Sequence, residues 1–168
     1  MRNIAKALGI FILGISLSSC AFARKWPRPT VEERLKTDKL RLGVIRVYQN
    51  EFGTEAPKDL LLLMVIAQSH QDLKKDLLAS GFKMDKEGMK IDIDIGVRAS
   101  ATGVFMVMRV IGHHPSAPNK SAFTLMLEEK VNGENVSEKI RKKDYSDFIK
   151  VGKSLLEKTP SELKIILL

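Results

Sequence analysis

Apolar and polar residues alternate most strictly between residues 88 and 97, in the segment GMKIDIDIGV. The odd positions from Met89 to Val97 are apolar, whereas the even positions from Lys90 to Asp94 are charged. A period of two predicts a strand with one face in the core and the other in water, which is typical of an antiparallel sheet. The next segment, 101–111, is apolar nearly throughout, and the short break between the two suits a hairpin.

Five further segments are predicted to be strands. Residues 40–48 favour a strand, although their apolar positions also fit one long helix over 31–52. The run LLLLMVIAQ over 60–68 suits a strand buried on both faces and equally fits a buried helix. Residues 121–131 and their partner 135–141 flank Asn132-Gly133, a strong turn signal, and 162–168 is predicted as a last strand.

Helices are predicted in three places. Thr30 and Glu33 form a capping box that starts a short helix. Residues 69–80 have an apolar stripe, and Gly81 stands where a helix stop belongs. A final helix over about 144–158 should end at Thr159-Pro160. Together these elements predict one α+β domain, in which two or three helices pack on one face of an antiparallel sheet of about five or six strands.

The N-terminal residues have the pattern of an export signal. Arg2 and Lys6 precede eleven mostly apolar residues, 7–17, and the small residues Ser18 and Ser19 follow. This order is typical of a secretory signal peptide, and the apolar stretch is shorter than the about 20 residues that span a bilayer. Cys20, the single cysteine of the chain, comes directly after it, so the protein has no intramolecular disulfide.

Leu17-Ser18-Ser19-Cys20 resembles the lipobox of bacterial lipoproteins at all four positions. The resemblance implies that Cys20 carries a diacylglyceryl group and becomes the first residue after cleavage. Further acylation, for example by palmitate, would then anchor the chain durably, since one chain alone anchors only marginally. In lipoproteins of double-membraned bacteria an Asp after the cysteine favours the inner membrane. Ala21 stands there, so the resemblance implies the outer membrane, facing the periplasm.

Three segments follow from this interpretation: a signal peptide over 1–19, a lipidated cysteine and tether over 20–30, and a globular domain over 31–168. The 168-residue chain has a net charge of +8, and removal of the signal leaves +6. A basic chain suits an anionic neighbour such as phospholipid headgroups, and export argues against nucleic acid. In the tether, Trp26 lies among three basic residues that suit the headgroup region, namely Arg24, Lys25 and Arg28.

Candidate chemistry is sparse in the domain. Residues 112–120 are predicted to be an exposed loop with two prolines, and we expect His113, His114 and Lys120 to form a recognition surface there. The adjacent histidines lack the further ligands of a metal site, and Asp92 and Asp94 are expected only to keep the outer face of their strand in water. No catalytic motif is present, and neither a cofactor nor a metal is expected.

Two functions fit these features. The first is a non-enzymatic envelope lipoprotein that binds another envelope protein, as an accessory or assembly subunit of secretion or envelope machinery. The alternative is a periplasmic inhibitor or immunity lipoprotein that neutralises a toxin or lytic enzyme, which a neighbouring toxin gene would favour. A hydrolase or ligand carrier would need a deep pocket with convergent polar groups.

Overall fold

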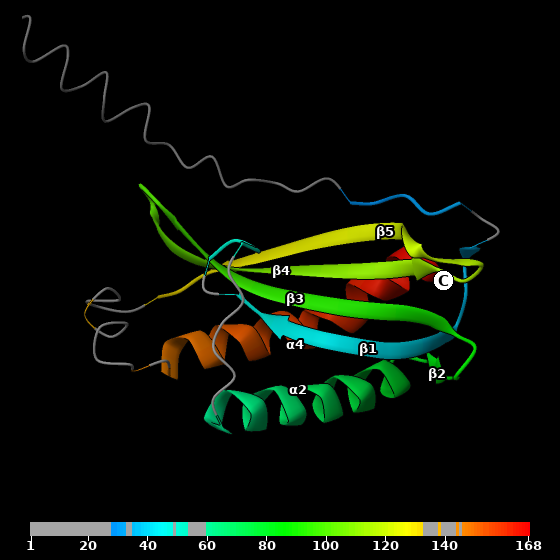
Figure 1. Ribbon diagram of the computed structural model, residues 1–168, viewed down its shortest axis with the longest axis horizontal. Helices are drawn as coiled ribbons and strands as arrows, with labels where there is room; N and C mark the ends of the chain where they lie inside the picture. The colour runs from blue at the N-terminus through cyan, green and yellow to red at the C-terminus, as the bar shows by residue number, and fades with distance from the viewer. Residues whose placement is uncertain are drawn as a thin grey trace, which may run out of the picture.

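The computed structural model describes residues 28–32, 35–48, 50–53, 60–132, 138, 144 and 146–168. Within them lie one five-stranded sheet and two long helices (Figure 1). In chain order the elements are β1 (Lys39–Val47), α2 (Leu60–Ala79), β2 (Lys83–Met84), β3 (Met89–Ser100), β4 (Gly103–His114), β5 (Ala117–Lys130) and α4 (Ser146–Leu167). The predicted α+β class is therefore confirmed, together with strands at 40–48, 88–97 and 121–131.

The sheet is mixed, which corrects the prediction of an antiparallel one. The strand order is β2-β1-β3-β4-β5. β1 runs parallel to both β2 and β3, whereas β3, β4 and β5 pair antiparallel through short turns. The cause is α2, which connects β1 to the β2–β3 part of the chain. A crossover of this length returns the chain to the end of the sheet where β1 began, so the strands that follow run parallel to β1.

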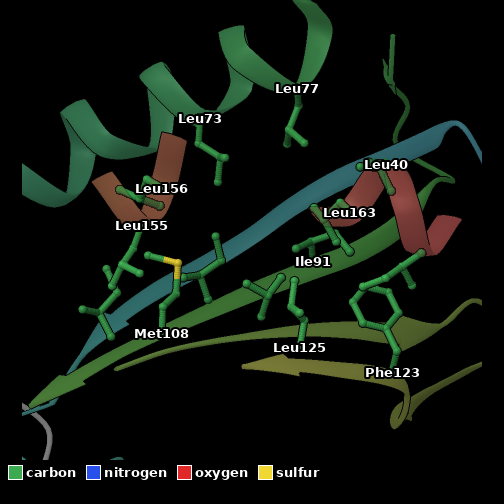
Figure 2. Packing of buried hydrophobic residues seen from close by; sticks show 14 of the residues in the cluster. Leu40, Leu73, Leu77, Ile91, Met108, Phe123, Leu125, Leu155, Leu156 and Leu163 are labelled. Carbon is green, nitrogen blue, oxygen red and sulfur yellow. The ribbon is translucent and has the colours of Figure 1, made fainter. Parts of the chain in front are cut away.

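The two helices lie on the same face of the sheet, and the core fills the space between the layers (Figure 1). Figure 2 shows Leu73 and Leu77 of α2 and Leu155 of α4 pointing toward the strands. From the sheet, Ile91 and Met108 point back at them, and all five side chains are at most 1% exposed. Complete burial of one such side chain contributes about 1.5–3 kcal/mol, so this layer is the main source of stability.

The apolar run at 60–68 belongs to α2, so of the two alternatives that its pattern left open the helix is correct and the strand is not. No glycine or proline stands between residues 60 and 79, and nothing ends the helix before its amphipathic half. The predicted stop is confirmed. Gly81 has φ of 98°, its amide donates to Leu78 O at 3.1 Å, and the Phe82 amide donates to Leu77 O at 3.1 Å. These two bonds form a Schellman motif, whose left-handed residue favours glycine.

α4 continues through Pro160 to Leu167, so neither the predicted stop at Thr159-Pro160 nor the last strand is present. A proline inside a helix costs about 3 kcal/mol. Here the apolar stripe continues on both sides of it, with Leu156 before and Leu163 after, and Pro160 itself is buried. Packing of the whole stripe on the sheet offsets that cost. Thr159 also donates its hydroxyl to Leu155 O at 2.9 Å, as expected inside a helix.

The segment before β1 already belongs to the domain. Val31 and Leu35 pack against the core, and the Thr37 amide donates to Leu167 O at the end of α4, at 3.0 Å. Residues 33–34 of the helix predicted from Thr30 lie outside the described residues, and beside them the Leu35 amide donates to Glu32 O at 2.8 Å. Most of the hairpin partner predicted at 135–141 lies outside the described residues, as do the signal peptide and residues 20–27.

Candidate functional site

A group of charged side chains from three strands lies on the face of the sheet that the helices do not cover. We call this group the ionic face. It consists of Arg46 of β1, Lys90, Asp92 and Asp94 of β3, and Arg109 and His113 of β4. The expectation that the two aspartates lie in water was wrong, because Asp92 is 3% exposed and Asp94 is 0% exposed. The alternating pattern of β3 correctly predicted the face on which the two aspartates lie. They are nevertheless buried, because long basic side chains from three strands cover them.

Asp94 lies between two arginines. It pairs in register with Arg46 on one neighbouring strand and with Arg109 on the other, so all three side chains share one row. Arg46 Nε donates to Asp94 Oδ1 at 2.7 Å, while Arg109 donates to Oδ2 from Nε at 3.0 Å and from Nη2 at 2.6 Å. The hydrogen bond that Arg46 donates to Asp94 is the main cause of the raised pKa of Arg46. Charge-assisted bonds from both sides compensate for the burial of the carboxylate.

Asp92 has three donors. Its Oδ1 accepts the Val44 amide at 2.9 Å, and its Oδ2 lies 2.9 Å from Lys90 Nζ and 2.8 Å from His113 Nε2. The β1–β3 register shifts between Leu42 and Ile45, and this bulge turns the Val44 amide toward the carboxylate. Burial raises the pKa of Asp92, but the bonds from Lys90 and the Val44 amide outweigh burial, so the pKa is lowered overall.

The bulge also requires a glycine. A Cβ on Gly43 would lie 1.8 Å from Asp92 Oδ1 and 2.6 Å from Lys90 Cε. The flexible Lys90 side chain can move aside, whereas the Asp92 carboxylate is held by its other donors, so the contact with Oδ1 is not relieved by a small shift. Gly43 therefore lets the backbone of β1 approach Asp92 closely enough for the Val44 amide to bond to it.

Tyr48 and residues 50–53 lie over one end of the ionic face. The Tyr48 amide donates to Ile95 O at 2.7 Å, and a Cβ on Gly96 would lie only 2.5 Å from Asn50 O. Phe52 adopts φ of 61°, and its ring stands 4.3 Å from the guanidinium carbon of Arg109. A phenylalanine in the left-handed region is strained, and such strain persists only where surrounding contacts fix it. The cation–π interaction with Arg109 is one of the contacts that fix Phe52 in this conformation.

A second ion pair extends the face along β3. Arg98 Nη2 lies 2.5 Å from Glu128 Oε2 of β5, and its guanidinium carbon stands 5.1 Å from the Phe105 ring. Arg98 Nε lies 3.8 Å from Glu51 Oε2 in the covering segment. The cations and carboxylates of this face therefore neutralise each other within the domain.

The predicted recognition loop at 112–120 is the end of a β-hairpin, which corrects that prediction. β4 runs through His114, β5 starts at Ala117, and only residues 115–116 form the turn. Two prolines do not break the pairing here, because Pro115 lies in the turn and Pro118 lies on β5, the edge strand of the sheet. Lys120 is exposed on β5 as expected.

The two histidines of this hairpin have different environments. His113 is 20% exposed and has both ring nitrogens engaged, Nε2 with Asp92 and Nδ1 with Pro118 O at 2.9 Å. Both of its ring nitrogens are thus bonded within the domain, and its part in a recognition surface stays a prediction. His114 Nδ1 accepts the Ser116 amide at 3.2 Å, a local bond at the turn.

Of the four basic and aromatic tether residues singled out above, the structure describes only Arg28. It is exposed and its Nε lies 3.5 Å from Glu162 Oε2 of α4. The tether therefore meets the domain by residue 28, before the predicted boundary at 30. Cys20, Arg24, Lys25 and Trp26 lie outside the described residues.

The described residues show limited capacity for chemistry. Among them, no group of three His, Cys, Asp or Glu side chains could hold a metal ion. His113 has no ring nitrogen left to accept a proton from a substrate. An open depression of about 220 Å³ lies between α2 and the β1–β2 edge, and it is lined by Leu40, Arg41, Leu42, His70, Lys74, Met84, Asp85 and Lys86. No helix in the part of the chain described here is long and apolar enough to cross a bilayer.

The sequence analysis predicted only part of the ionic face. Asp92 and Asp94 were identified, but their partners Arg46 and Arg109 were not. Arg109 had a signal: it is the single charge in the apolar run 101–111. A charged side chain in such an apolar run is buried at a cost unless it pairs with an opposite charge, and β3 supplies Asp94 at the paired position.

Comparison with known proteins finds no matching family model and no matching curated protein. Two solved structures show a weak likeness. An uncharacterized protein has 11% sequence identity and a TM-score of 0.36, over 76% of this chain and 91% of its own. A minor lipoprotein from Acinetobacter baumannii has 11% identity and a TM-score of 0.35, over 77% of this chain and 90% of its own.

Proposed function

We propose that this protein is a membrane-anchored envelope lipoprotein that binds another envelope protein as a non-enzymatic accessory or assembly subunit. The observation that carries the proposal is Leu17-Ser18-Ser19-Cys20, placed directly after a basic and apolar signal. The lipobox marks one residue, Cys20, as the site of the lipid. The outer membrane, facing the periplasm, is the proposed location because Ala21 follows the cysteine.

The ionic face supports a binding role over a catalytic one. Its aspartates are fully engaged by protein donors, so they hold the strands together and are not available to a substrate. A set of accessible polar groups lies at the tip of the β4–β5 hairpin. There Ser116, Asn119 and Lys120 are exposed beside His114. This tip, residues 114–121, is the proposed contact surface for the partner, and the half-buried His113 borders it.

The anchor is tested by mass spectrometry of the N-terminal peptide and by labelling with palmitate. Wild-type protein should begin at Cys20, carry acyl chains and enter the detergent phase. Cys20→Ser should take up no label and should keep its signal segment, because the lipoprotein peptidase acts on lipidated substrate. Its thermal unfolding should match wild type, since residue 20 precedes the domain. Label retained by Cys20→Ser would overturn the proposal.

The binding role is tested by photocrosslinking in intact cells. A photoreactive residue in place of Lys120 should capture one distinct protein. The same residue in place of Lys75, an exposed position on α2 far from the hairpin, serves as the matched control. The identity of the captured protein separates the alternatives, because a toxin or lytic enzyme would favour the immunity function. Equal labelling from both positions, or from neither, would contradict a binding surface at this tip.

A further inference from the structure

The solvent side of α4 carries a basic stripe. Exposed residues recur along it every three or four positions, which places them in one line on the helix. They are Ser146, Lys150, Lys153, Glu157, Ser161, Lys164 and Leu168. Three of the seven are lysines and one is an acid, so the stripe has a net positive charge. The opposite side of α4 is the apolar one that packs on the sheet.

Exposed apolar side chains lie at the C-terminal end of the same stripe. Ile165 is 56% exposed and Leu168 is 50% exposed. They are two of the four large hydrophobic side chains that are strongly exposed in the described residues, and the other two, Val44 and Leu78, lie on separate elements. Lysines beside exposed aliphatic side chains on one helix face are typical of helices that lie on a lipid headgroup surface.

The tether brings this end of α4 to the membrane. Arg28 pairs with Glu162, which is three residues before Ile165 on the helix. Seven residues lie between Cys20 and Arg28, and the eight Cα-to-Cα steps that join them span about 28 Å even when fully extended. That is less than the length of α4, whose 22 residues extend about 33 Å. A lipid on Cys20 therefore keeps the C-terminal half of α4 close to the bilayer.

We infer that the exposed stripe of α4, from Lys150 to Leu168, docks on the surface of an anionic phospholipid membrane. The inference rests on the proposed lipid anchor at Cys20. The lysines contact the phosphate groups, and Ile165 and Leu168 enter the boundary between headgroups and acyl chains. The sheet is then directed away from the bilayer, so that the ionic face and its cover point toward the periplasm.

The test uses the full lipidated protein, reconstituted in vesicles of phosphatidylcholine and phosphatidylglycerol that also contain a nickel-chelating lipid. A spin label is placed on Ser161→Cys in the stripe. The matched label is on Thr124→Cys, an exposed residue of β5 on the sheet face opposite α4. The lipid on Cys20 blocks its thiol, so only the new cysteine reacts. Nickel at the headgroups should relax the label at 161 several times more strongly than the label at 124.

The charge contribution is measured with three neutralised lysines. Lys150→Gln, Lys153→Gln and Lys164→Gln together should weaken docking about a hundredfold, since each basic residue near an anionic surface contributes about fivefold. The control is Lys74→Gln, Lys75→Gln and Lys86→Gln, which changes the net charge equally at exposed positions outside the stripe. The control protein should dock like wild type.

Three results would overturn the inference: equal relaxation of the two labels, docking that ignores the stripe lysines, or a label at 161 that is shielded in cells but free in vesicles. The last result would mean that a protein covers the stripe. Mass spectrometry of the same sample separates this inference from the proposed function. An unmodified Cys20 would contradict the anchor itself, whereas a lipidated Cys20 with an undocked α4 would contradict only the docking.

Discussion

Asp94 of β3 and Arg109 of β4 stand directly opposite each other, and two hydrogen bonds, at 2.6 and 3.0 Å, join the guanidinium to one carboxylate oxygen. Arg46 occupies the other oxygen from the neighbouring strand. One carboxylate thus links three strands, because β3 pairs parallel with β1 and antiparallel with β4. The mixed sheet has its parallel and antiparallel halves joined at β3, and this ion triad lies across that junction.

Removal of the two arginines from the triad, with Asp94 left in place, should strongly destabilise the fold. Arg46→Met together with Arg109→Met leaves Asp94 buried without a cation, which should lower the free energy of unfolding by about 3–5 kcal/mol. Adding Asp94→Leu should recover most of that loss, because no buried charge then remains. Urea unfolding measures both. Arg28→Met is the control: its pair with Glu162 is exposed, so the change should be below about 1 kcal/mol. A double variant as stable as wild type would show that Asp94 is reached by water.

Stability should fall in acid through Asp92. The pKa of this carboxyl is lowered in the folded protein, so below the unfolded pKa of about 3.9 the unfolded state binds more protons. Its contribution is therefore complete above about pH 4 and is lost as pH falls through the folded pKa. Urea midpoints between pH 6 and pH 2 measure this loss. Asp92→Asn should be less stable at pH 6 and should show a shallower decline, and an unchanged slope would contradict the assignment.

The sequence predicted the elements whose ends are marked locally. Strict alternation predicted β3, and Gly81 predicted the end of α2, because the Schellman bonds need only neighbouring residues. The undecided run at 60–68 and the wrong helix stop at Thr159-Pro160 have a common cause, which is not local. The run 60–68 and the Thr159-Pro160 stop depend on what packs beside them, and tertiary burial of the α2 and α4 stripes overrides a local breaker or an ambiguous period. Burial of Asp92 and Asp94 likewise depended on strands up to 48 residues away in sequence.

Two glycines should respond oppositely to alanine. A Cβ on Gly96 would lie 2.5 Å from Asn50 O, a backbone atom in the segment that covers the ionic face. Gly96→Ala must displace that segment, and overpacking of this kind costs about 1–3 kcal/mol. A Cβ on Gly152 would meet only the flexible end of Met106, at 3.3 Å.

Because glycine inside a helix costs about 0.5–1 kcal/mol relative to alanine, Gly152→Ala should be neutral or stabilising. Thermal unfolding of both variants gives the comparison. A harmless Gly96→Ala would mean that residues 50–53 do not lie on β3.

His113 and His114 are adjacent but should differ sharply when replaced. His113 donates or accepts at both ring nitrogens, and one partner is the nearly buried carboxylate of Asp92. A hydrogen bond to a charged group contributes about 1.5–3 kcal/mol, so His113→Ala should lower the free energy of unfolding by that amount. His114 makes one local bond to the Ser116 amide, and His114→Ala should change stability by less than about 0.5 kcal/mol.

Urea unfolding at constant pH compares the two histidine variants, and Asp92→Asn combined with His113→Ala tests the coupling between Asp92 and His113. If the bond between them carries the loss, the double variant is less destabilised than the sum of the single variants. Additive losses, or equal losses for the two histidines, would show that His113 is not part of the ionic face.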